Sequence, residues 1–272
     1  MLRPSRHTVD HGSLERETLE INEAPLECFV RRNYTEACPA DLLVLKFPGT
    51  AGRAERSTDF PAKRFANVRT SQWTWNPPGY GASQGKASLN RIAATSLEFW
   101  RQVIERESND STTIWLCGNS LGCVTAMNVA AAMQPDPRRC GMILRNPPPL
   151  ISVVKRAAAR YPAGSLMGPV AESLVDSMNL LITSSQSKLP AVFLQSELDN
   201  LVPVDHQNDA ISRYAGENRK VLMKGLGHGG IATDCHEPLI EEALQWLWDQ
   251  TRNELNNNRR QDERILTVED QS

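Results

Sequence analysis

The chain has 272 residues, of which 40% are hydrophobic and 23% charged, and its 30 basic and 32 acidic side chains give a net charge of −2. This composition is typical of a soluble globular protein with enough surface to bury a core, and it excludes collagen, coiled coils and disordered chains. The balanced charge gives no electrostatic case for binding nucleic acid or an anionic membrane.

Six cysteines are spread along the chain without C-x-x-C spacing, and several lie inside apolar runs. We interpret them as small core side chains rather than as metal ligands or a disulfide framework. The first twenty residues contain no apolar run of signal-peptide length, and nowhere do eighteen apolar residues follow one another. These features predict a reduced, cytoplasmic protein without a membrane span.

Two polar ends frame the chain. Residues 1–20 and 253–272 contain little that could be buried, and we predict that both are tails. In the domain between them, residues 21–252, short apolar segments alternate with helical patterns, which indicates an α/β fold with parallel strands joined by crossover helices. The predicted strands are Leu26–Arg31, Leu42–Phe47, Asn67–Trp75, Thr112–Cys117, Gly141–Leu144, Ala191–Gln195 and Lys220–Met223.

The predicted helices are Leu89–Glu107, the alanine-rich Leu121–Met133, and Leu239–Thr251. One interruption, residues 146–189, carries short helical patterns between two predicted strands. It predicts a small cap or excursion, whose apolar side chains either wall a substrate pocket or pack among themselves.

The strongest local motif is Gly118-Asn-Ser120-Leu-Gly122, a G-x-S-x-G between a predicted strand and a predicted helix. This context is typical of a sharp, strained turn that exposes a nucleophilic serine and permits only small neighbours, which Gly118 and Gly122 supply. The N–H of Leu121, at the start of the helix, would then point toward developing negative charge. The alternative is a chance glycine-serine turn.

A serine nucleophile needs a histidine base that a carboxylate orients, and in this arrangement the chain order is serine, acid, histidine. Asp199 follows the predicted strand Ala191–Gln195, and His228 lies in a glycine-rich loop after Met223. Glu197 is the rival acid. The other histidines do not lie in such a loop, so we predict a Ser120, Asp199 and His228 triad.

An oxyanion hole needs a second backbone donor, usually from the loop after the strand that precedes the first helix. The segment Pro48-Gly-Thr50-Ala-Gly52 follows the predicted strand Leu42–Phe47. Small residues there would let the backbone approach a substrate closely. We therefore pair the N–H of Thr50 with that of Leu121; the alternative is an ordinary glycine-rich turn.

Cofactor motifs are not found. The segment from Asn76 to Gly85 could pass for a dinucleotide fingerprint, but Gln84 stands where G-x-G-x-x-G requires its third glycine. No phosphate-binding loop and no His/Cys cluster with metal-ligand spacing is present. We expect neither a cofactor nor a metal.

With these residues in view, the chain from about Leu26 to Thr251 resembles the α/β-hydrolase superfamily, in particular the small-capped, serine aminopeptidase-like branch. The segment Asn76-Pro-Pro-Gly-Tyr-Gly-Ala-Ser-Gln-Gly85 is similar to its D-x-P-G-Y-G-x-S-x-G loop, and Gln195–Pro203 and Gly225–His228 are similar to its acid and histidine segments. Two positions depart from the branch: Pro48 replaces a histidine before the oxyanion glycine, and Asn76 replaces an aspartate. Both bear on hydrogen bonds around the oxyanion loop.

The resemblance implies an α/β-hydrolase fold, a mostly parallel sheet of about eight strands covered by helices on both faces, and a serine mechanism without a cofactor. We expect hydrolysis of a small-molecule carboxylic ester, thioester or amide. Because a fold does not fix a substrate, the branch name is no evidence of peptidase activity. The alternative is a catalytically weak or inactive hydrolase-fold protein that binds a small molecule or a partner.

Overall fold

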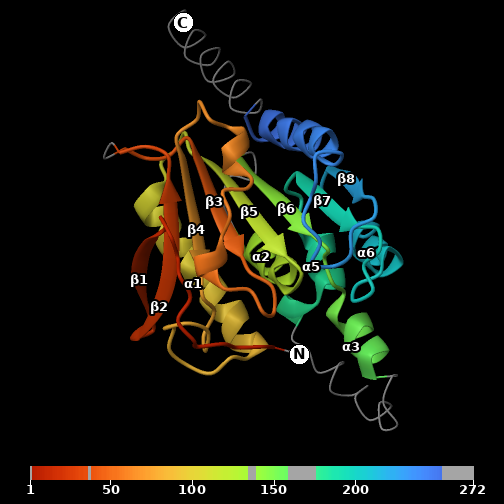
Figure 1. The fold of residues 1–272 in the computed structure, drawn as a ribbon, viewed down its shortest axis with the longest axis horizontal. Coiled ribbons are helices and arrows are strands. Elements are labelled where there is room, and N and C mark those ends of the chain that lie inside the picture. Colours follow the sequence, from red (N-terminus) through yellow and green to blue (C-terminus); the bar gives the residue numbers. More distant parts are fainter. Residues whose placement is uncertain (1, 36–37, 134–138, 159–175, 253–272) are drawn as a thin grey trace, which may run out of the picture.

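A single eight-stranded sheet organises the chain (Figure 1). The computed structural model describes residues 2–35, 38–133, 139–158 and 176–252. Its strands lie in the order β1-β2-β4-β3-β5-β6-β7-β8, with β1 and β8 at the two edges. Their bounds are Glu15–Ile21 (β1), Ala24–Arg32 (β2), Leu42–Phe47 (β3), Thr70–Trp75 (β4), Thr113–Asn119 (β5), Cys140–Arg145 (β6), Ala191–Ser196 (β7) and Asn218–Met223 (β8).

The sheet is mostly parallel. Strands β4, β3, β5, β6, β7 and β8 pair in parallel, whereas β2 pairs antiparallel with both β1 and β4. Parallel strands covered on both faces are expected to be nearly continuous apolar runs, and β5 is buried from Thr113 to Gly118. Because these six strands run in parallel, their carboxyl ends meet at one edge of the sheet, where α/β folds place their functional loops.

Helices cover both faces. One face packs against α1 (Leu89–Glu107), α2 (Leu121–Ala132), α5 (Leu180–Gln186) and α6 (Val204–Ile211), and α2 is buried along most of its length. The other face packs against the helix over residues 237–252 and against Phe65. The predicted helices Leu89–Glu107, Leu121–Met133 and Leu239–Thr251 are thus present, with shifts of one or two residues at three ends.

The expected polar tail over residues 1–20 is wrong from Glu15 onward, where β1 begins. In this edge strand charged residues alternate with Leu19 and Ile21, which are buried. The pattern has the two-residue period of a half-buried strand, but its acidic side chains lower the mean hydropathy to that of a tail. Asn22 and Glu23, both with positive φ, form the tight turn into β2.

The expected cap over residues 146–189 is described only in part, because residues 159–175 lie outside the described ranges. Helix α3 (Leu150–Ala158) projects from the body of the molecule (Figure 1). Helix α5 contacts α2, and its Leu180 is 1% exposed. This part of the predicted cap therefore belongs to the helical layer on the sheet. The predicted tail over residues 253–272 also lies outside the described ranges.

The cysteines divide into two groups. Cys28, Cys117, Cys123 and Cys140 are buried, as expected for small core side chains. Cys38 and Cys235 are not, because they lie in loops rather than in the apolar strands. In the described part of the chain, no helix combines the length and apolarity needed to cross a bilayer.

Candidate active site

Ser120 lies at the sharp turn between β5 and α2, with φ of +52° and ψ of −122°. A non-glycine residue in this region is strained, and such strain persists only where the surroundings enforce it. A Cβ atom on Gly118 would lie 2.5 Å from the Cα of Cys123, and one on Gly122 would overlap the carbonyl oxygen of Phe47. Both glycines are therefore required for the tight approach of strand, turn and helix.

Ser120, His228 and Asp199 form one hydrogen-bonded chain. The His228 Nε2 lies 3.0 Å from the Ser120 Oγ, and its Nδ1 lies 2.6 Å from the Asp199 Oδ2. The Asp199 side chain is fully buried, whereas that of His228 is 25% exposed. The other carboxylate oxygen of Asp199 accepts the N–H groups of Leu201 and Val202 at 2.9 and 2.7 Å. This holds the carboxylate rigidly toward the imidazole.

Glu197, the alternative candidate for the catalytic acid, does not hydrogen-bond to His228 in the described part of the chain but makes a different hydrogen bond. Glu197 accepts the backbone N–H of Gly225 at 2.8 Å, so it supports the loop that leads to His228. Among the described residues, no histidine other than His228 hydrogen-bonds to Ser120. His236, for example, is buried and contacts the carbonyl oxygen of Lys224.

The loop after β3 lies directly against the turn at Ser120. A Cβ atom on Gly49 would lie 3.1 Å from the carbonyl oxygen of Asn119 and 3.4 Å from the Ser120 Cβ. Within the described residues, the N–H groups of Thr50 and Leu121 make no hydrogen bond to the protein. Both donors are thus available to a ligand oxygen, as an oxyanion hole requires.

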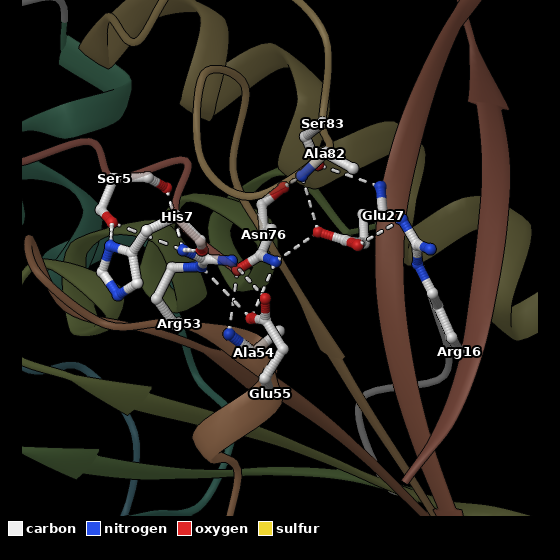
Figure 2. Close-up of polar contacts among 10 residues, drawn as sticks. All are labelled: Ser5, His7, Arg16, Glu27, Arg53, Ala54, Glu55, Asn76, Ala82 and Ser83. Atoms are coloured by element: carbon white, nitrogen blue, oxygen red, sulfur yellow. Dashed lines mark hydrogen bonds and ion pairs between the residues drawn. The ribbon is translucent and has the colours of Figure 1, made fainter. Parts of the chain in front are cut away.

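A cluster of buried polar side chains contacts the loop after β3, and Figure 2 shows Asn76 at the centre of this cluster. The Asn76 Oδ1 accepts the N–H of Ala54 at 2.9 Å. Its Nδ2 donates to Glu27 at 2.7 Å and to Glu55 at 3.0 Å. Glu55 also pairs with Arg53. Asn76 therefore links the loop after β3 to β2 and to the loop after β4.

The pKa of Glu55 reflects these contacts. Burial acts to raise the pKa of this carboxyl, but hydrogen bonds from Asn76, from its own backbone and from Arg53 outweigh the burial, and the pKa lies below its usual value. Glu55 is therefore a carboxylate at neutral pH, and the cluster needs the Asn76 amide as a donor to it.

Arg145 and Asn146, at the end of β6, contact the candidate site and were not predicted from the sequence. The carbonyl oxygen of Arg145 accepts the N–H of Ser120 at 2.8 Å. Asn146, which is fully buried with φ of +51°, donates to the carbonyl oxygen of His228 at 3.2 Å. Together they tie the serine turn to the histidine loop. The available signal was a polar pair at the end of the strand beside β5, which is where α/β folds place their sites.

A cavity of about 570 Å³ opens beside the turn at Ser120. It reaches Gly49 and Asn119, the residues that precede Thr50 and Ser120 in the chain. Its volume is in the range of ligand pockets in enzymes. In the described ranges, no group of three His, Cys, Asp or Glu side chains gathers as metal ligands would.

Solved structures share this architecture. The chain is similar to an esterase of Pyrococcus furiosus, Pf2001, with a TM-score of 0.65 and 16% identity over 91% of this chain and 98% of that one. It is similar to the acetyl xylan esterase of Paenibacillus sp. R4, with a TM-score of 0.65 and 15% identity over 86% and 87% of the two chains. The fold is that of the α/β hydrolases. An α/β serine hydrolase homologue from Coxiella burnetii has the same α/β-hydrolase fold, with a TM-score of 0.53 and 17% identity over 89% of this chain and 99% of that one.

Sequence comparison reaches less far. No protein-family profile matches the chain. It is 24% identical over 150 residues to an uncharacterised protein of Mycobacterium tuberculosis, found in two strains. The match covers 55% of this chain, and the chain spans about half the length of the curated relatives it matches.

Proposed function

We propose that the protein is a serine hydrolase that cleaves a carboxylic ester, thioester or amide through an acyl-enzyme on Ser120. The single observation that carries this proposal is the continuous chain of hydrogen bonds from Ser120 through His228 to the buried Asp199. The strained conformation of Ser120 supports it, because strain of this kind clusters at active sites.

In the proposed mechanism each of these groups has one role. With the Nδ1–H of His228 donated to Asp199, the Nε2 is the acceptor, and it takes the Ser120 proton as Oγ attacks the substrate carbonyl carbon. The Thr50 and Leu121 N–H groups stabilise the resulting oxyanion. His228 then gives the proton to the leaving group, which departs as the C–O, C–S or C–N bond breaks.

Deacylation repeats the sequence with water. His228 takes a proton from the water as it attacks the acyl carbon, and returns the proton to the Ser120 Oγ as the acid leaves. Asp199 holds the imidazole in the required tautomer and stabilises its charged form. The esterases among the solved structures are consistent with an ester as the first substrate class to test.

A fluorophosphonate probe that reacts only with activated serines tests the proposal. We expect the wild-type protein to be labelled, and the Ser120→Ala variant to remain folded without labelling. Turnover of short-chain 4-nitrophenyl esters by that variant should fall by about 10⁴-fold or more in kcat. Absence of labelling in folded wild-type protein, or labelling that survives in Ser120→Ala, would contradict the proposal. Binding of a small molecule without turnover would then favour a binding protein.

A further inference from the structure

Lys46 lies in strand β3 at a core-facing position where an apolar residue is expected. Strand β3 reads LLVLKF, and its Leu42 and Val44 pack in the core on the face covered by residues 237–252. Because side chains alternate along a strand, Lys46 points to the same face. Lys46 is half-buried, and a lysine at a core-facing position of a strand is uncommon unless it is paired or functional.

Lys46 faces the cavity beside Ser120. The floor of this cavity is formed by the carboxyl ends of neighbouring strands, and it is apolar apart from Lys46, Thr74, Asn119 and Arg145. Cys117, Ile143, Leu194 and Met223 supply the apolar part. The same cavity extends to Gly49 and Asn119, which precede Thr50 and Ser120 in the chain, and its floor carries a cation.

The Lys46 ammonium contacts only neutral acceptors in the described part of the chain. Its Nζ donates to the carbonyl oxygens of Thr58 and Phe60 at 2.7 and 2.9 Å, and it forms no ion pair with a described carboxylate. Burial lowers the pKa of Lys46 to about 8, so it is still mostly charged at pH 7. Burial also raises the pKa of the adjacent Cys117 to about 12, and this thiol therefore supplies no counter-charge.

The other charges around the cavity leave an excess of positive charge. Arg145 donates through Nη2 to the carbonyl oxygen of Gly230, and its Nε is buried without a partner among the described residues. Two further charged residues line the cavity, and each already forms an ion pair: Arg53 with Glu55, and Glu237 with Arg64. Arg56 and Lys63 lie at the exposed rim, against one exposed carboxylate, Asp59.

We propose that Lys46, with Arg145, binds an anionic group of the substrate, so that the hydrolase prefers esters, thioesters or amides whose apolar chain ends in a negative charge. This inference rests on the proposed function for the position of the reacting bond. Asp59 attracts Lys46 without forming an ion pair with it, and an anion in the cavity would add a direct counter-charge. The low dielectric of the cavity would strengthen that attraction. The apolar floor between the two ends fits a short methylene chain.

Two matched esters test this preference. The mono-4-nitrophenyl ester of adipic acid carries a terminal carboxylate, and 4-nitrophenyl hexanoate is its neutral counterpart of equal chain length. We expect wild-type protein to have a kcat/KM about tenfold or more higher for the adipate ester. Lys46→Gln keeps a donor for the two carbonyl groups but removes the charge, and should lower this ratio about tenfold. Lys46→Arg should retain most of it, and Lys220→Gln on exposed β8 is the control.

A ratio near one in wild-type protein, or a ratio that Lys46→Gln leaves unchanged, would overturn the proposal. Adipate and inorganic phosphate, tested as competitive inhibitors, distinguish the sources of the charge: stronger inhibition by adipate supports a carboxylate, and stronger inhibition by phosphate supports a phosphate ester group.

The pocket and the proposed catalysis can fail separately. If the fluorophosphonate labels Ser120 but the esters show no charge preference, the hydrolase stands and the anion site is wrong. If neither labelling nor turnover occurs, calorimetric titration of adipate into wild-type and Lys46→Gln protein still tests the site. Binding that the variant weakens about tenfold supports it; equal or absent binding in both proteins overturns it.

Discussion

Asn76 illustrates how one buried side chain adapts the loop around a site. It is fully buried, and its Nδ2 faces two carboxylates, those of Glu27 and Glu55. Arg16 pairs with the first of these and Arg53 with the second. An aspartate at this position would add a third carboxylate without a third cation. The neighbours that this chain places around residue 76 therefore favour asparagine over aspartate there.

Replacing Asn76 with Asp should consequently destabilise the protein in a pH-dependent manner. Repulsion among three buried carboxyls raises the folded-state pKa of at least one of them above its unfolded value. The variant's deficit in unfolding free energy is then small below the unfolded pKa, near 4, grows as the pH rises from there toward the folded pKa, and is constant above the folded pKa. We expect a deficit of roughly 2–3 kcal/mol at neutral pH.

Urea unfolding of both proteins at about pH 5 and about pH 8 measures this difference. Asn33→Asp is the matched control, because Asn33 makes similar hydrogen bonds at an exposed position. A deficit for Asn76→Asp that does not change between the two pH values would show that the extra charge is neutralised by another group.

The choice between Asp199 and Glu197 gives a second prediction at this scale. Asp199→Asn loses the carboxylate that orients His228, and kcat should fall by about 10³- to 10⁴-fold with the fold retained. Glu197→Gln keeps an oxygen that can accept the Gly225 N–H, and kcat should change by less than about threefold. Steady-state kinetics with a 4-nitrophenyl ester compares the two. Equal losses would mean that the loop, rather than the Asp199 carboxylate, limits the reaction.

At the scale of the elements, the turn between β5 and α2 is constrained by its glycines. Helix propensity alone predicts that Gly122→Ala stabilises α2 by about 1 kcal/mol. The contact geometry predicts the opposite, because the new Cβ would overlap the backbone of Phe47 at the end of β3. Helix α2 would have to shift away from the sheet, and we expect a loss of roughly 2 kcal/mol or more.

Thermal and urea unfolding decide between these signs. Gly229→Ala serves as the control for stability, since a Cβ atom there meets nothing within 4 Å. A Gly122→Ala protein that is more stable than wild type would show that α2 and β3 are less closely packed than the structure has them.

The contrast between local and long-range signals explains what the sequence could predict. Strands such as Leu42–Phe47 and the strained turn at Ser120 follow from apolar runs and glycine spacing, which are local patterns. Asp199 and His228 could be placed because each follows a predicted strand. The partners of Asn146 could not, because they come from segments far along the chain. Those of Lys46 could not, because they are backbone carbonyl groups of an irregular loop, which leave no pattern in the sequence. Strand β1 was not predicted, because its acidic residues give the segment the low hydropathy of a tail, although its apolar residues recur at every second position.

At the scale of the whole molecule, the N-terminal segment joins the loops around Ser120. The N–H of Arg3 and the O–H of Tyr80 both donate to the carbonyl oxygen of Thr50, at 3.1 and 2.8 Å. Arg53 donates to the carbonyl oxygens of Ser5 and His7 (Figure 2). The segment thus holds the predicted oxyanion loop from a position remote in sequence.

Deletion of residues 1–7 should therefore lower kcat as well as stability. The deletion removes one donor to Thr50 and two acceptors of a buried guanidinium, and hydrogen bonds to charged groups contribute about 1.5–3 kcal/mol each. We expect kcat to fall about tenfold or more. Tyr80→Phe removes the other donor to the same carbonyl group and should cost about 1 kcal/mol of stability.

The two changes should not combine independently, because Arg3 and Tyr80 act on one carbonyl group and also contact each other at 3.2 Å. In a double-mutant cycle, the deletion and Tyr80→Phe together should alter kcat by a factor that differs from the product of their separate effects. Tyr214→Phe is the control, since its hydroxyl donates to the carbonyl oxygen of Leu189, away from this loop, and its effect should multiply with that of the deletion. If Tyr80→Phe multiplies in the same way, the N-terminal segment stabilises the fold without acting through Thr50.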